Sequence, residues 1–93
     1  MKNAKHTPGP WKSYEDDGFI NLMVVDAEGY YIAEAMGRTK KNMEANARLI
    51  AAAPELLEAL EKLCNRWQGD TELYAHGEEI KAGRAAIAKA KGQ

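Results

Sequence analysis

From about residue 42 to residue 68 the chain has the apolar spacing of an amphipathic helix, and Pro54 interrupts it. Proline has no backbone N–H and its ring clashes with the preceding turn, so a helix bends or restarts there. Proline is also well tolerated in the first turn of a helix. The sequence therefore predicts a helix over 42–68 that is kinked or split at Pro54, with Asn42 as the N-cap of its first part.

The part of this helix that follows the proline is strongly amphipathic. Its apolar side consists of Leu56, Leu57, Leu60, Leu63, Cys64 and Trp67. A further helix is expected over 71–91, and apolar residues recur there every seven positions, at Leu73, Ile80 and Ile87. Gly83 lies near the same seam, which favours close packing against another helix of this chain or of a second subunit.

The N-terminal part of the chain has the pattern of a small sheet. Residues 1–10 are polar, contain two prolines around a glycine and are expected to form an extended lead-in. Residues 11–36 are expected to form a three-stranded antiparallel meander, with strands over 11–14, 19–26 and 30–35 and a tight turn over 26–29. The middle strand is apolar on both faces, so we expect a helix to cover one face and a partner subunit the other.

The predicted fold class is therefore α+β: an N-terminal antiparallel three-stranded meander followed by two or three helices. A chain of 93 residues is long enough for a single domain. So short a chain buries a modest core, and we expect it to form an oligomer. Trp11 is expected to cover an edge of that core.

Composition narrows the class of protein. The chain has 13 basic and 14 acidic side chains, a balance that disfavours a nucleic-acid-binding protein. No run approaches the roughly 20 apolar residues of a membrane span. The single cysteine, Cys64, excludes an internal disulfide and indicates a reducing compartment. These features predict a cytoplasmic protein.

The sequence contains no arrangement of residues that is typical of catalysis. Ser13 is the only serine, and nothing places a base beside it. Cys64 lies on the apolar side of a helix, where a cysteine is usually a small buried hydrophobe. His6 and His76 have no metal-ligand spacing. We therefore expect a protein that is not an enzyme and that holds neither a metal nor a cofactor.

The strongest candidate for a binding site is the basic loop and helix start over 37–48. A helix N-terminus attracts anions, and neighbouring arginine and lysine side chains add charge and donors suited to phosphate. An asparagine there can read a base or ribose edge, and tyrosines on the adjacent strand can stack on a base. The candidate ligand-binding residues are Arg38, Lys40, Lys41, Asn46, Arg48, Tyr30 and Tyr31. The competing interpretation is a solvated basic loop with local structural hydrogen bonds.

Two stretches resemble a widespread family of small phage and prophage proteins. They are HTPGPW over 6–11 and NARLIAAAPELLEAL over 46–60. The resemblance spans about residues 6–63. It implies a phage-encoded protein with a short β region followed by helices, in the cytoplasm of an infected bacterial host.

The layout of a small sheet, an Asn-Ala-Arg helix start and C-terminal helices is also similar to that of the phage anti-Thoeris sponge proteins. Those proteins sequester cyclic ADP-ribose-type signals, without cleaving them, in pockets between subunits. The resemblance implies that Asn46 and Arg48 contact a nucleotide-derived ligand and that Tyr30 or Tyr31 stacks on its base. The alternative is a protein-interaction module that uses the Leu56–Trp67 face, or the last helix, to inhibit a host defence protein such as a nuclease or CRISPR complex.

Overall fold

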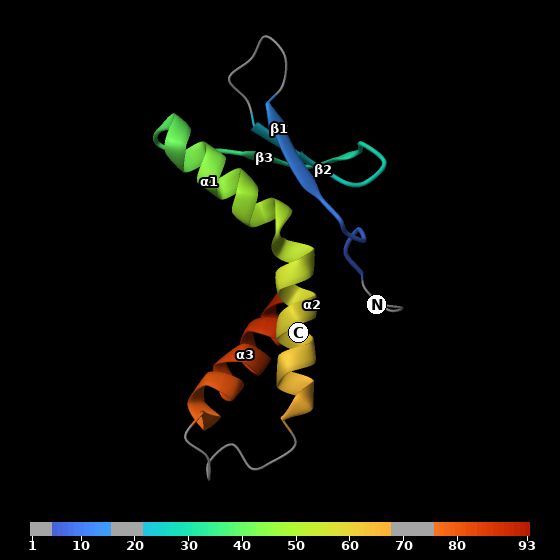
Figure 1. Cartoon of the computed structure of the whole chain (residues 1–93), viewed down its shortest axis with the longest axis vertical. Coiled ribbons are helices and arrows are strands. Elements are labelled where there is room, and N and C mark those ends of the chain that lie inside the picture. The colour runs from blue at the N-terminus through green and yellow to red at the C-terminus, as the bar shows by residue number, and fades with distance from the viewer. Residues whose placement is uncertain (1–4, 16–21, 68–75) are drawn as a thin grey trace. The chain divides into compact units, whose positions relative to one another are not determined.

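The computed structural model describes residues 5–15, 22–67 and 76–93. Its elements are β1 (Lys12–Glu15), β2 (Leu22–Val25), β3 (Tyr31–Ala35), α1 (Lys40–Ala51), α2 (Ala53–Arg66) and α3 (Gly77–Ala90) (Figure 1). In these described residues, one antiparallel sheet with the order β1-β2-β3 is followed by three helices. The predicted α+β class and the meander are therefore confirmed. The chain divides into two compact units, Met1–Glu55 and Leu56–Gln93.

A tight turn joins the second and third strands. The Asp26 carboxylate accepts hydrogen bonds from the backbone N–H groups of Glu28 and Tyr30, each at 2.9 Å, and Gly29 has a φ of +91°. A short acidic side chain that caps the turn, and a glycine in the left-handed region, are typical of a hairpin connection. The predicted turn is therefore confirmed. The first residues of the predicted strand 19–26 lie outside the described residues.

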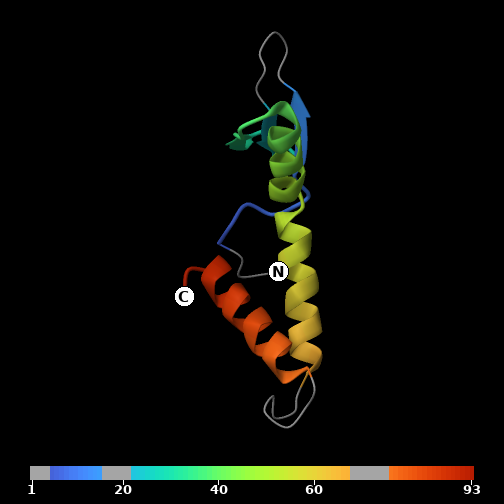
Figure 2. The same cartoon turned by 90° about the vertical axis from the view of Figure 1, so that its left-hand side faces the viewer.

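The core of the first unit lies between the sheet and α1, which runs along one face of the sheet (Figure 2). Val24 of β2 is fully buried there, together with Ala35 of β3 and Ala47 of α1. Trp11 is half-buried against this cluster, as expected. The predicted helical cover on one face of the middle strand is therefore confirmed. Cover of the other face by a partner subunit stays a prediction.

The predicted start of the first helix is wrong by two residues. α1 begins at Lys40, and Thr39 is its N-cap, with an extended φ of -129°. The Thr39 hydroxyl accepts a hydrogen bond from the Asn42 N–H at 3.1 Å, so Asn42 lies in the first turn and is not the cap. The loop before α1 also approaches the helix closely at Gly37. A Cβ added to this glycine would lie 2.9 Å from the Met43 backbone nitrogen. Both residue types can cap a helix, and the position of the loop selects the threonine.

Replacing Thr39 by alanine is expected to lower the free energy of unfolding of the first unit by about 1 kcal/mol, because one N–H of the first turn loses its acceptor. Chemical denaturation measures this change, with Trp11 fluorescence as the probe in a Trp67→Phe background. Thr39→Ser keeps the hydroxyl and is expected to unfold like the parent. Equal midpoints for the alanine and serine variants would contradict the capping role.

The predicted division of the long helical stretch is confirmed, but the break precedes Pro54 by two residues. α1 ends at Ala51, and the N–H of Ala52 donates to the Arg48 carbonyl at 3.0 Å. α2 begins at Ala53, so Pro54 lies in its first turn. A backbone N–H has no partner within the helix at that position, and a proline is harmless there.

The lead-in contacts this junction. Gly9 lies so close to Pro54 that a Cβ on Gly9 would be 3.0 Å from the proline Cβ. The Trp11 Nε1–H donates to the Thr7 carbonyl at 3.2 Å. The His6 ring meets the Trp11 ring edge-on, with centroids 6.3 Å apart. These contacts bring the lead-in and the start of α2 together.

In the second unit α3 packs antiparallel against α2 (Figures 1 and 2). The closest contact is at Gly83, where an added Cβ would lie 2.8 Å from the Cys64 sulfur. The predicted role of Gly83 in close helix packing is therefore confirmed. Lys91 Nζ also pairs with Glu61 Oε2 at 2.6 Å. The predicted helix over 71–91 corresponds to α3, and its first residues, including Leu73, lie outside the described part.

Candidate functional site

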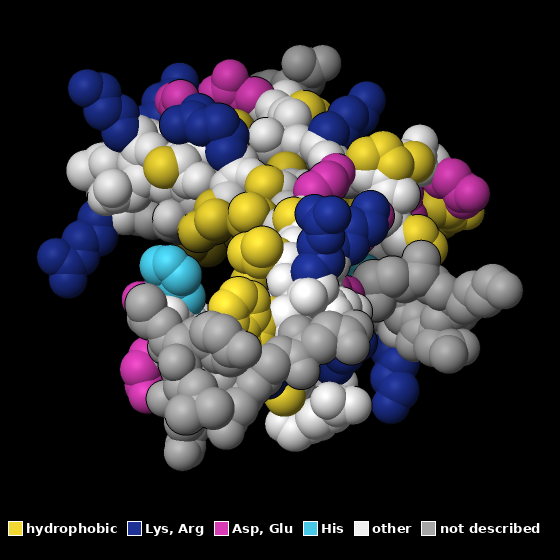
Figure 3. All heavy atoms as spheres, turned by 60° about the horizontal axis from the view of Figure 1, so that its bottom comes forward, with side chains coloured by type: hydrophobic (Ala, Val, Ile, Leu, Met, Phe, Trp, Pro, Cys, Tyr) yellow, Lys and Arg dark blue, Asp and Glu magenta, His cyan; other side chains and the backbone are white. Residues whose placement is uncertain are grey.

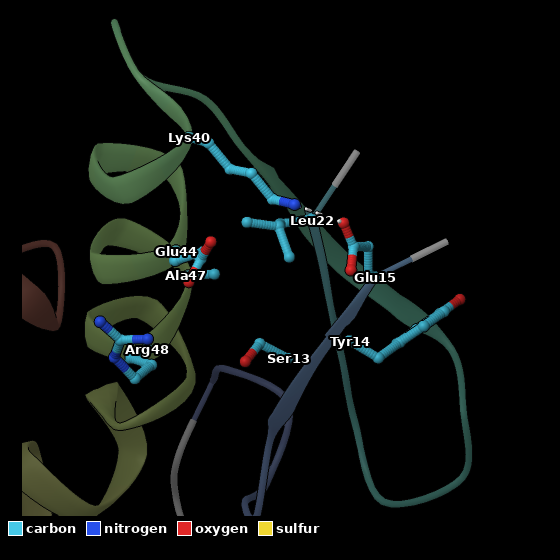
Figure 4. Close-up of a pocket in the computed structure, with 8 residues that line it drawn as sticks. All are labelled: Ser13, Tyr14, Glu15, Leu22, Lys40, Glu44, Ala47 and Arg48. Carbon is cyan, nitrogen blue, oxygen red and sulfur yellow. Dashed lines mark ion pairs between the residues drawn. The ribbon is translucent and has the colours of Figure 1, made fainter. Parts of the chain in front are cut away.

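A shallow groove of about 250 Å³ lies between α1 and β1 in the first unit (Figure 4). Its lining residues are Ser13, Tyr14, Glu15, Leu22, Lys40, Glu44, Ala47 and Arg48. Lys40, Glu44 and Arg48 follow one another at intervals of four positions, which places them along one face of α1, and Ala47 lies three positions after Glu44. Ser13 of β1 is paired with the buried Val24, so its side chain is on the same face of the sheet as α1.

The charges in the groove are balanced. Lys40 Nζ lies 3.5 Å from Glu15 Oε1, and both side chains are largely exposed, so water and salt screen this ion pair. Glu44 adds a second carboxylate and Arg48 a second cation. A groove with two acids and two bases does not attract a simple anion strongly. It suits a ligand that offers both negative charge and hydrogen-bond donors.

Arg48 is the available cation of the groove. Lys40 reaches toward Glu15, whereas Arg48 and Ser13 lie toward the opposite end (Figure 4). Among the residues that the structure describes, the Arg48 guanidinium has no hydrogen-bond or ion-pair partner. A guanidinium presents donors in a planar fork that matches phosphate and carboxylate oxygens. The end of the groove that holds Arg48 and Ser13 can therefore bind an oxyanion group.

Asn46 has a local structural partner. Its Nδ2 donates to the Met36 carbonyl at 2.6 Å, which ties α1 to the end of β3. This contact corresponds to the competing interpretation, in which Asn46 makes a local hydrogen bond. Arg38 and Lys41 are exposed and do not line the groove. Of the four predicted basic residues, the structure therefore brings Lys40 and Arg48 together in the groove and leaves Arg38 and Lys41 outside it.

The two candidate tyrosines lie at the other end of the sheet. Tyr31 pairs with Val25 of β2, whereas the groove is beside Leu22, at the start of that strand. Tyr30 and Tyr31 are 69% and 65% exposed. In one copy of the chain they therefore do not reach a ligand bound between α1 and β1. Tyr14 is at the groove instead, but its ring points away from α1 (Figure 4).

The groove also holds acidic and hydroxyl residues that were not predicted from the sequence, namely Ser13, Glu15 and Glu44. Helical spacing could have found Glu44, because it lies four residues from both Lys40 and Arg48. No local signal links Ser13 and Glu15 to the helix. They reach the groove only because β1 packs beside α1.

Figure 3 shows basic, acidic and apolar side chains of the described residues on one face. In the described part of the chain, no group of three His, Cys, Asp or Glu side chains is placed to hold a metal ion. Within residues 5–15, 22–67 and 76–93, no helix is long and apolar enough to cross a membrane.

Comparison with known proteins identifies a family for this chain. Residues 1–93 match the family described as Salmonella phage P22 protein Y8K6. No curated protein and no solved structure matches the chain. The match confirms the resemblance to phage proteins and does not extend to the sponge proteins. The chain therefore belongs to the Salmonella phage P22 protein Y8K6 family.

Proposed function

We propose that this phage protein acts by binding and not by catalysis, as a counter-defence sponge that sequesters a nucleotide-derived cyclic signal in the cytoplasm of the infected host. The observation that carries the proposal is the Arg48 guanidinium in the groove between α1 and β1, at the end that also holds Ser13. Among the described residues, this guanidinium has no hydrogen-bond or ion-pair partner. No cleavage is required of the groove residues, which need only hold the ligand.

The mixed charge of the groove supports a nucleotide over a simple anion. A phosphate of the ligand accepts hydrogen bonds from Arg48 and from the Ser13 hydroxyl. Ribose hydroxyls and an exocyclic amine are donors, and the Glu44 carboxylate can accept from them. Cyclic ADP-ribose-type molecules and cyclic oligonucleotides offer both kinds of group.

The size of the groove favours a site that two copies share. Pockets that enclose a drug-sized ligand have volumes of roughly 300 to 1,000 Å³. A groove of about 250 Å³, open on one side, covers only part of a cyclic dinucleotide-sized ligand. A second copy of the chain would cover the rest, and it could supply the aromatic stacking that Tyr30 and Tyr31 of the same copy do not.

Native mass spectrometry of the full chain against cyclic nucleotides and cyclic ADP-ribose isomers tests the proposal. We expect intact ligand to be retained and then released on heating. Arg48→Gln is expected to weaken binding at least tenfold, because a charged hydrogen bond to phosphate contributes roughly 1.5 to 3 kcal/mol. Lys89→Gln removes one positive charge from the exposed part of α3 and is expected to bind like the parent. Recovery of degraded ligand, or equal binding by both variants, would refute the sponge.

The two exposed tyrosines favour a second candidate, a protein-interaction module that inhibits a host defence protein such as a nuclease or CRISPR complex. Tyr30 and Tyr31 are adjacent, more than three-fifths exposed and outside the groove. Tyrosine is enriched at the centres of protein interfaces. In this case Tyr30→Ser/Tyr31→Ser would abolish anti-defence activity and Arg48→Gln would not. The sponge requires that Arg48→Gln abolish it.

A further inference from the structure

α2 has more apolar surface than α3 covers. Leu60 and Cys64 contact α3 at Gly83. Leu56 and Leu63 remain 53% and 61% exposed, although both belong to the apolar side of the same helix. They are seven residues apart, so they lie two turns apart along one line of the helix. The exposed Ala59 lies between them, and the three residues form a second apolar stripe on α2.

The charges of α2 are divided along its length. Its N-terminal half carries Glu55 and Glu58, and its C-terminal half carries Lys62 and Arg66. Glu61 also lies in the C-terminal half, but its carboxylate is mostly buried and is paired with Lys91 of the same chain. An antiparallel second copy of α2 would place each acidic half beside a basic half. A parallel copy in register would place acid beside acid and base beside base, which is unfavourable. The charge pattern of α2 therefore complements itself in the antiparallel orientation only.

The apolar stripe has the same self-complementarity. A two-fold axis near Ala59 places Leu56 of one copy against Leu63 of the other, and the reverse contact forms by symmetry. Alanine at the centre lets the two helix backbones approach closely. Glu58 and Lys62 form an ion pair at 3.0 Å within one helix. In the antiparallel dimer, these two side chains can also interact with Lys62 and Glu58 of the second copy.

We propose that two copies of this chain associate through antiparallel pairing of their α2 helices, with Leu56, Ala59 and Leu63 at the centre. The proposal does not depend on ligand binding at the groove. α2 has 14 residues and is therefore about 21 Å long. A pair of such helices is smaller than a standard protein interface, so we expect a reversible, concentration-dependent dimer.

Disulfide crosslinking of the full-length protein tests the orientation. Leu56→Cys and Leu63→Cys are prepared separately, mixed and oxidised, and the wild-type chain serves as the control for the buried Cys64. We expect a covalent dimer, twice the 10.3 kDa chain mass, in the mixture only. In an antiparallel pair, two copies of residue 56 are separated by about 10 Å along the axis, beyond the roughly 7 Å limit for a disulfide.

Self-crosslinking of each variant alone would indicate a parallel pair and would overturn the proposal, as would no crosslink in any sample. Sedimentation gives a second test that needs no engineered cysteine. The wild-type mass is expected to rise from 10.3 kDa toward twice that value as concentration increases. Leu63→Glu is expected to remain at the monomer mass, with unchanged helical circular dichroism because Leu63 is mostly exposed. A wild-type chain that stays monomeric would also overturn the proposal.

Discussion

Replacing Gly83 by valine is expected to unfold the second unit. A Cβ at this position would lie 2.8 Å from the Cys64 sulfur and 3.2 Å from a Leu60 methyl carbon, and valine adds two further methyl groups. Overpacking of this kind typically costs about 1 to 3 kcal/mol, and occasionally more. The higher helix propensity of valine over glycine recovers only a few tenths of a kcal/mol. We expect a net loss of about 2 kcal/mol or more, which a unit this small does not tolerate.

Trp67 fluorescence, in a Trp11→Phe background, reports on this unit because Arg84 Nη2 donates to the Trp67 carbonyl at 3.0 Å. Ala82→Val is the matched control, since it places the same side chain on the exposed neighbouring position of α3. Its denaturation midpoint is expected to stay close to that of the parent, because the only cost is the lower helix propensity of valine relative to alanine. Similar midpoints for the two valine variants would show that the α2–α3 contact at Gly83 does not limit stability.

The class and order of the elements could be predicted because each has a strong local signal. The Asp26–Gly29 turn, the apolar middle strand that contains Val24 and the helical spacing after Pro54 all agree with the structure. The start of α1 could not be predicted, because Thr39 and Asn42 are both good capping residues. The choice depends on the close approach of Gly37 to the helix, which is a tertiary contact.

The candidate site was harder to predict than the fold. Arg48 and Lys40 reach the groove because both lie on the face of α1 that meets β1. Tyr30 and Tyr31 were expected beside them, because they lie on the strand that precedes α1 along the chain. Strand register sets their position instead, since β3 begins at the opposite end of the sheet. Sequence proximity gives the order of these residues and not their distance in the fold.

The two stretches that resemble phage proteins meet in the structure. Gly9 of the first stretch contacts Pro54 of the second, and Trp11 packs against the core that includes Ala47. These contacts give the two stretches a role in holding the lead-in, α1 and the start of α2 together. Of these stretches, Arg48 is the residue that contributes a cation to the groove between α1 and β1. The resemblance therefore reflects the fold more than the site.

Replacing Val24 by alanine is expected to lower the free energy of unfolding of the first unit by about 2 to 3 kcal/mol. Val24 is 0% exposed and packs with Ala35 and Ala47 in the core between the sheet and α1. Loss of two carbon groups removes about 1.6 kcal/mol of transfer free energy, and the remaining cavity adds to it. Chemical denaturation followed by Trp11 fluorescence, with Trp67 replaced by phenylalanine, measures the change.

Leu49→Ala is the control for this prediction. It deletes more apolar atoms than Val24→Ala does, but from a side chain on α1 that is 64% exposed. Leucine and alanine have similar helix propensities, so we expect a change within about 0.5 kcal/mol. The larger deletion should therefore have the smaller effect, because burial between α1 and the sheet, and not the number of carbon atoms, determines the cost. If Leu49→Ala proved the more damaging variant, the core of the first unit would lie on the exposed side of α1, and the groove beside Ala47 would have to be reassigned.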